Sequence, residues 1–118
     1  MGGLAKDTAM SFSRGDVIWL RVDYLEGGVG KPHPAIVISS NEFNDSHEWG
    51  IIIRGSSDVP VRPDPDHYVI KKSRENGLDR DTVFPPIIQS AKWARVLKKV
   101  GTVSPYQIKQ LMDGISGV

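Results

Sequence analysis

Two residues whose side chains could do chemistry, Lys31 and His33, stand directly before a predicted strand at 35–39 that is apolar up to its last residue, Ser39. A buried strand needs only apolar side chains, so the strand itself does not account for an ammonium and an imidazole just before its first residue. Imidazole is suited to proton transfer because its ordinary pKa, about 6.5, lies near physiological pH. The pair therefore marks a candidate ligand-facing site. The alternative is a histidine that ends a strand and hydrogen-bonds locally, beside a solvated lysine.

The composition excludes several other kinds of site. The chain has no cysteine, which rules out disulfides, thiolate zinc sites and thiol catalysis. The remaining histidines, His47 and His67, fall in separate predicted loops, so we expect no metal site and no cofactor. The formal net charge of the 118 residues is +1, so any binding to nucleic acid has to rest on a local patch.

The length suits one domain, expected at 14–118 after a flexible tail at 1–13. No apolar run approaches the roughly 18 residues of a membrane span, and the first residues lack the apolar core of a signal peptide. We expect a cytoplasmic protein that does not contact membranes.

The elements that must position the candidate residues are short strands rich in β-branched and aromatic side chains. The expected strands are 17–23, 35–39, 49–54, 67–71 and 82–88, with a further short pair within 95–103. Pro85 and Pro86 place the fifth strand at an edge or in a bend. The segments 24–33 and 55–66 are expected to be irregular loops, and 40–47 is expected to be a polar turn.

One helix is expected, at the end of the chain. Ser104 is its predicted N-cap, Pro105 its first residue and Gln107 the partner in a capping box. Apolar residues then recur at helical spacing: Ile108, Leu111, Met112 and Ile115. Several short strands with one terminal helix predict a mainly β fold, a small β-barrel or half-open roll.

The sequence resembles the MazF/PemK toxins of bacterial type II toxin–antitoxin systems, in the CcdB/PemK superfamily, from about Ser13 to Ile115. Five short motifs in the same order carry the likeness: 14–19, 30–39, 40–44, 89–93 and 101–105. The resemblance implies an SH3-like barrel with a C-terminal helix, acting as a homodimer. It further implies a growth-inhibiting, metal-independent endoribonuclease that cuts single-stranded mRNA at short motifs, and a cognate antitoxin whose disordered acidic tail covers the RNA groove.

The resemblance also implies roles for individual residues. The family places an arginine immediately before the proline that opens the second strand, where this chain has His33, and a hydroxyl after the third strand, where it has Ser56. These two are the candidate catalytic residues, and the candidate RNA-binding residues are Lys31, Arg54, Ser57, Gln89 and Ser90. An ordinary Ser-Ser turn is the alternative for Ser56 and Ser57. Trp19 and Trp49 are expected in the core, and Trp93 at the surface or in a dimer contact.

Histidine in place of arginine exchanges a permanent cation for a titratable ring. His33 then either acts as general acid or base while Lys31 supplies the fixed charge, or marks a catalytically weakened relative that binds RNA. A third alternative is a CcdB-like poison that binds DNA gyrase without chemistry. The two alternatives to the nuclease differ from it in leaving RNA uncut.

Overall fold

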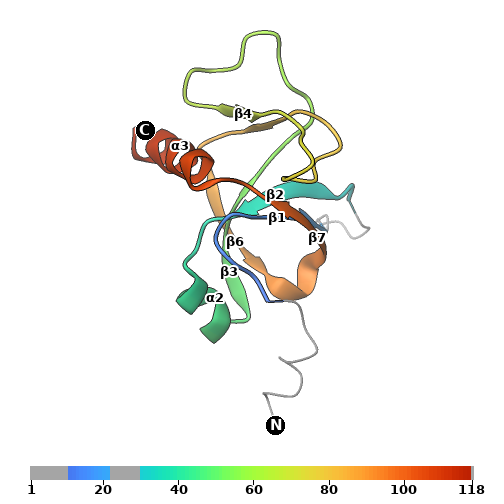
Figure 1. The fold of residues 1–118 in the computed structure, drawn as a ribbon, viewed down its shortest axis with the longest axis vertical. Coiled ribbons are helices and arrows are strands. Elements are labelled where there is room, and N and C mark those ends of the chain that lie inside the picture. The colour runs from blue at the N-terminus through green and yellow to red at the C-terminus, as the bar shows by residue number, and fades with distance from the viewer. Residues whose placement is uncertain (1–10, 22–29, 118) are drawn as a thin grey trace.

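Five antiparallel strands form one sheet in the order β6-β3-β2-β1-β7 in the computed structural model, which describes residues 11–21 and 30–117 (Figure 1). These strands are β1 (Asp16–Leu20), β2 (His33–Val37), β3 (Trp49–Arg54), β6 (Ile88–Lys92) and β7 (Val96–Thr102). A separate hairpin pairs β4 (Tyr68–Ile70) with β5 (Thr82–Phe84). The helices are α2 (Asn41–Ser46), the 3-10 turn η1 (Trp93–Arg95) and α3 (Pro105–Ser116).

The large sheet curls on itself. Its two end strands, β6 and β7, are separated along the chain only by the three residues of η1. Two backbone hydrogen bonds hold the connection through η1 in place. The Trp93 N–H donates to the Glu48 carbonyl (3.0 Å), and the Arg21 N–H donates to the Arg95 carbonyl (2.9 Å). Within the described residues no ladder joins β6 to β7, so the expected mainly β fold is confirmed as a half-open roll.

Both faces of the central strands are buried, which explains why β2 has no polar interruption. On one face, Val17, Ile36 and Ile53 pack against the β4–β5 hairpin and Leu111 of α3. On the other face, inside the curl, lies a second core that contains Ile18, Leu20, Ala35, Val37, Ile52, Ala91 and Val96.

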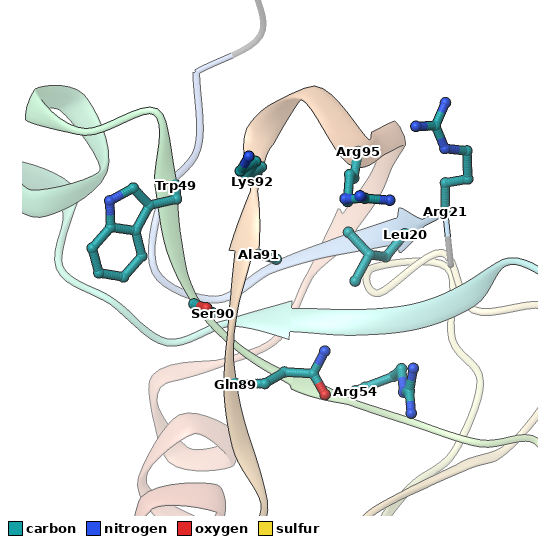
Figure 2. A pocket seen from close by; sticks show the side chains of 9 residues that line it. All are labelled: Leu20, Arg21, Trp49, Arg54, Gln89, Ser90, Ala91, Lys92 and Arg95. Atoms are coloured by element: carbon teal, nitrogen blue, oxygen red, sulfur yellow. The ribbon is translucent and has the colours of Figure 1, made fainter. Parts of the chain in front are cut away.

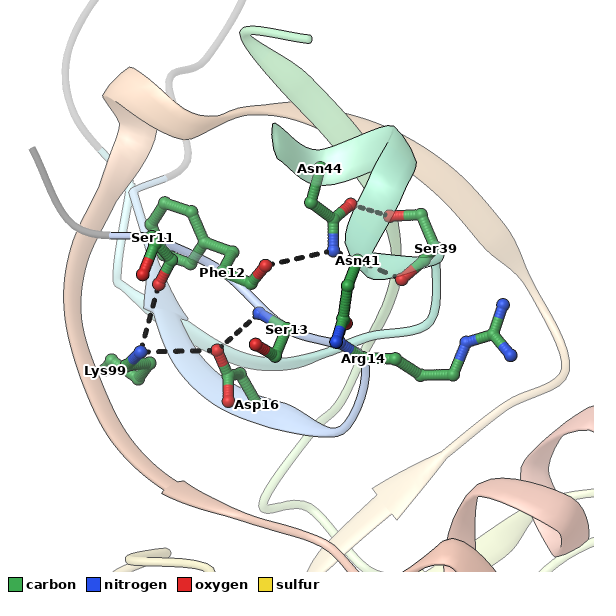
Figure 3. A network of polar contacts seen from close by, with 9 residues as sticks. All are labelled: Ser11, Phe12, Ser13, Arg14, Asp16, Ser39, Asn41, Asn44 and Lys99. Carbon is green, nitrogen blue, oxygen red and sulfur yellow. Dashed lines mark hydrogen bonds and ion pairs between the residues drawn. The ribbon is translucent and has the colours of Figure 1, made fainter. Parts of the chain in front are cut away.

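The residues just before β1 close this inner core. Phe12, expected to lie in the flexible tail, is 5% exposed, and its ring stacks on Trp93 with centroids 4.4 Å apart. The Phe12 carbonyl accepts a hydrogen bond from the Asn44 side-chain amide at 3.3 Å (Figure 3). The packed domain therefore includes Phe12 and does not begin at residue 14; residues 1–10 lie outside the described chain.

The terminal helix follows its predicted cap. The Gln107 N–H donates to Ser104 Oγ (3.1 Å), and the Ser104 N–H donates to Gln107 Oε1 (3.0 Å), which completes the capping box. Figure 1 shows α3 beside the β4–β5 hairpin, away from α2. In the part of the chain that the structure describes, no helix has the length and apolarity needed to cross a membrane.

Three other expectations were wrong. The polar segment at 40–47 contains helix α2, because Ser40 Oγ accepts the Phe43 N–H (3.2 Å) as an N-cap. The segment 82–88 is not one strand: the chain bends at Pro85 and Pro86, as expected, but there it divides into β5 and β6, which belong to different sheets. The expected strand pair within 95–103 is the single strand β7. The first strand and the 24–33 loop were expected to include residues 22–29, which lie outside the described chain.

Candidate functional site

An open groove of about 400 Å³ crosses the end strand β6 (Figure 2). Among the described residues, its lining combines four cationic side chains with two polar and three apolar ones and contains no carboxylate. The lining residues are Leu20, Arg21, Trp49, Arg54, Gln89, Ser90, Ala91, Lys92 and Arg95. They come from β1, the residue after it, β3, β6 and η1.

The strand register decides which side of β6 each residue occupies. Gln89 pairs with Ile52, whose side chain lies on the inner face of the sheet. Side chains alternate along a strand, so Arg54, two residues after Ile52, lies on the same face as Gln89. Trp49 pairs with Lys92 and lies on the other face. Figure 2 shows this division, with the indole of Trp49 on one side of β6 and the three arginines on the other. A ligand that touches both sets has to cross β6.

The electrostatics of the groove favour an anionic chain. Lys92 and the three arginines supply four positive charges against a net charge of only +1 for the chain. Guanidinium groups donate in a fork that fits phosphate oxygens, and several cations in a row suit a polyphosphate backbone better than a single anion. Any binding to nucleic acid was expected to rest on a local patch, and this groove is a local patch of positive charge.

Three of the seven residues proposed from sequence line this groove: Arg54, Gln89 and Ser90. The half-buried His33 does not line it but opposes Leu20 in the β1–β2 ladder, and Leu20 does. His33 also shares the inner face with Arg54, since Arg54 pairs with Ala35.

Ser56 and His33 lie at the same end of the sheet, although the backbone of Ser56 pairs with Val83 of β5. The Gly55 N–H donates to the Pro34 carbonyl (2.8 Å), which extends the β2–β3 ladder toward these two residues. Ser56 Oγ accepts the Asp58 N–H at 3.1 Å, the local turn bond expected if the serine were purely structural. The Ser56 hydroxyl can still donate its proton, so this turn bond orients the hydroxyl and leaves it able to donate to a ligand.

The other two proposed residues, Lys31 and Ser57, are exposed and do not line the groove. The structure instead adds Arg21, Lys92, Arg95 and Trp49. Lys92 falls inside the 89–93 motif, so its position in the sequence offered a signal. Arg21 and Arg95 gave none, because their meeting depends on the curl of the sheet.

The expected locations of Trp49 and Trp93, core for the first and surface for the second, are both wrong. Trp49 is 38% exposed and lines the groove, although it was expected in the core. Trp93 was expected at the surface but is half-buried, stacks on Phe12 and donates from Nε1 to the His47 carbonyl (3.1 Å). Gly50 leaves the space that the Trp93 ring fills, because a Cβ there would lie 2.2 Å from Trp93 Cη2.

Metal-binding side chains gather elsewhere. Among residues 11–21 and 30–117, Asp64, Asp66 and His67 alone form a group close enough to hold an ion, with ligand atoms within 4.8 Å of one another. Both aspartates are exposed, and the group contains neither His33 nor any residue of the groove.

A model of the PemK-like, MazF-like toxins of type II toxin–antitoxin systems matches residues 13–118. The chain belongs to this family. No curated protein matches its sequence. In this PemK/MazF-family toxin, the groove is built on the curled sheet and η1, and the C-terminal helix α3 does not line it.

Solved structures share the fold at low identity. A MazE–MazF structure from Deinococcus radiodurans matches with a TM-score of 0.73 and 15% identity over 92% of this chain and 95% of the other. A mycobacterial endoribonuclease in complex with its cognate antitoxin gives 0.70 and 16% over 90% and 92%. The Mycobacterium tuberculosis toxin MazF-mt6 gives 0.66 and 15% over 88% and 94%. At these identities the likeness shows a common fold.

Proposed function

We propose that the chain is an endoribonuclease toxin that cuts single-stranded RNA without a metal ion. Family membership and the fold shared with mycobacterial endoribonucleases support this activity. The observation that carries it is the groove, whose described lining has four cations and no carboxylate, together with the position of His33, which pairs with Leu20 of that lining.

The cut proceeds through the ribose 2′-hydroxyl next to the scissile bond. A base removes its proton, the 2′-oxygen forms a bond to phosphorus, and the bond to the 5′-oxygen of the next nucleotide breaks as an acid returns a proton to that oxygen. The products are a 2′,3′-cyclic phosphate and a 5′-hydroxyl. His33 carries the proton transfers in this proposal, because imidazole can both accept and donate near neutral pH.

The charge that develops on phosphorus needs preorganised donors. Arg54 shares a sheet face with His33, and its guanidinium provides the fixed positive charge that His33 lacks. The Ser56 hydroxyl donates a hydrogen bond to a phosphate oxygen. Gln89, Ser90 and the remaining cations of the groove hold the RNA, while the exposed Lys31 and Ser57 contact it outside the groove.

The partners follow from the same groove. Relatives in solved structures are bound to a cognate antitoxin, MazE in one case. A disordered acidic tail would place carboxylates where the RNA phosphates bind, so antitoxin and RNA compete. We further propose that the toxin acts in the cytoplasm as a homodimer.

The test incubates purified protein with long unstructured RNA in EDTA. We expect discrete fragments whose downstream ends are phosphorylated by polynucleotide kinase without prior phosphatase treatment, which reports a free 5′-hydroxyl. His33→Ala should abolish cutting and keep the fold, whereas His67→Ala, which removes a histidine away from the groove, should cut normally. RNA that stays intact over a broad pH range refutes the proposal.

The histidine in place of the family arginine favours a second candidate, an RNA-binding relative with weakened chemistry. It predicts a gel shift without cleavage that His33→Arg leaves unchanged. If His33→Arg instead creates cutting, the native protein is impaired at one position.

A further inference from the structure

Trp49 occupies an unusual position for a tryptophan at the start of a strand. It is 38% exposed, lines the cationic groove, and lies across β6 from Arg54. Neither the proton transfers nor the phosphate charge of the proposed reaction uses it. An exposed indole inside a binding groove calls for a ligand with an apolar face.

Two neighbouring rings support Trp49. Phe43 and His47, one helical turn apart around α2, stack in parallel with centroids 3.8 Å apart and 7° between their planes. The Trp49 ring stands nearly perpendicular to both, at 82° to Phe43 (4.9 Å) and at 77° to His47 (5.7 Å). His47 is itself fixed, since its Nδ1 lies 2.9 Å from the Phe43 carbonyl oxygen and 2.9 Å from Ser46 Oγ. The indole is therefore held in one orientation in a residue that stays 38% exposed to solvent.

The residue directly across the ladder from Trp49 is Lys92, which lines the same groove. An aromatic ring beside an ammonium matches the two parts of a nucleotide, a base with a π-face and a phosphate. Stacking on aromatic side chains combined with a basic groove is the general way in which proteins hold single strands. An acidic peptide would satisfy Lys92 but offers no flat ring for the indole.

We propose that Trp49 and Lys92 form a nucleotide subsite for single-stranded RNA outside the scissile bond, in which Trp49 stacks on a base and Lys92 binds the adjacent phosphate. The proposal rests on the RNA-cleaving function and adds a second anchoring point to it. Trp49 and Arg54 are the first and last residues of β3, so the two ends of the site lie about 17 Å apart at roughly 3.3 Å per residue. That span accommodates several nucleotides, and the RNA chain crosses β6 between them.

The test uses a short RNA that contains a mapped cleavage site, with a 2′-deoxy nucleotide at the scissile position so that binding is measured without cutting. Abasic nucleotides replace the bases one at a time. One position away from the scissile bond should weaken binding to the native protein about 5- to 100-fold. Trp49→Ala should weaken binding of the intact RNA by a similar factor and abolish the sensitivity to that abasic position, while Trp49→Phe retains part of both.

Tyr106→Ala is the matched control, because Tyr106 is an aromatic residue that is 66% exposed and lies outside the groove. It should bind every RNA like the native protein. Lys92→Ala should reduce the salt dependence of binding by the equivalent of about one neutralised phosphate. Circular dichroism confirms that each variant is folded, and the abasic series on the native protein needs no variant.

The outcomes separate this proposal from the proposed function. If the native protein binds RNA but never cuts it, the nuclease fails, and an abasic series on a short RNA selected by binding alone still tests the subsite. If it cuts, and Trp49→Ala binds intact and abasic RNA like the native protein, the subsite is refuted. A Trp49→Ala variant that loses only antitoxin binding or self-association also overturns it, because Trp49 then serves a protein interface.

Discussion

The buried carboxylate of Asp16 lies 3.4 Å from the ammonium of Lys99, which joins β1 to β7 (Figure 3). Asp16 Oδ2 also accepts the Ser13 N–H at 2.8 Å, and Lys99 Nζ donates to the Ser11 carbonyl at 3.0 Å. The pair thus anchors the segment that carries Phe12 over the inner core. The polar network at this end of the roll supports packing, and none of its residues lines the cationic groove.

Asp16→Ala is expected to lower the free energy of unfolding by about 1–3 kcal/mol, because it removes a buried acceptor that serves two donors. Asp16→Asn retains an acceptor for Ser13 and should cost less. Urea denaturation measures both. The exposed Asp79 provides the control, and Asp79→Asn should leave the midpoint unchanged. An Asp16→Ala midpoint equal to the native one contradicts the anchoring role.

Gly50→Ala is expected to destabilise the fold by about 1–3 kcal/mol through overpacking. The added Cβ would meet two Trp93 ring carbons at 2.2 and 2.3 Å, and that ring is already stacked on the buried Phe12. Thermal unfolding followed by circular dichroism measures the loss. Gly117→Ala is the comparison, since its Cβ would meet nothing closer than 3.4 Å. Equal melting temperatures for the two variants would show that Trp93 can move aside.

Arg54→Ala is expected to weaken RNA binding and to reduce the salt dependence of log Kd by about 0.7 for each phosphate that the arginine neutralises. Arg54→Lys should keep most of that salt dependence but lose cutting, because an ammonium lacks the forked geometry of the guanidinium. Titrations at several salt concentrations and single-turnover cutting provide the two measurements. Arg74→Ala removes an exposed arginine outside the groove and should change neither. An unchanged salt slope for Arg54→Ala would place Arg54 away from the RNA.

Burial, and secondarily the neighbouring Tyr106, raises the pKa of the Tyr68 phenol. A raised pKa in the folded state means that the unfolded chain loses this proton first, so stability falls as the pH rises above about 10. Tyr68→Phe should make the decline in unfolding free energy above that pH shallower. Tyr106→Phe removes the smaller cause and should have a smaller effect, and both are measured by urea denaturation at a series of alkaline pH values. Identical alkaline profiles for native protein and Tyr68→Phe would contradict this.

Local chemistry made α3 predictable. The hydrogen bonds that begin this helix join Ser104 to Gln107, three residues away. The helix start therefore depends only on neighbouring residues, which the sequence shows directly. The apolar run of β2 was equally clear, because burial on both faces leaves no polar residue in the strand after His33. Helix α2 was missed because the short polar segment carries no apolar repeat, and its buried Asn44 is held partly by the distant Phe12 carbonyl.

The sequence by itself determined the family, the mainly β fold, the terminal helix and three residues of the groove, since each depends on motifs or contacts within a few residues. Only the tertiary structure decided the groove, which joins Arg21, Arg54 and Arg95 through the curl of the sheet. It also decided which tryptophan faces solvent. A strand places alternate residues on opposite faces, but whether a face is covered depends on what the distant chain packs there. Phe12 packs on Trp93, and the open groove leaves Trp49 exposed.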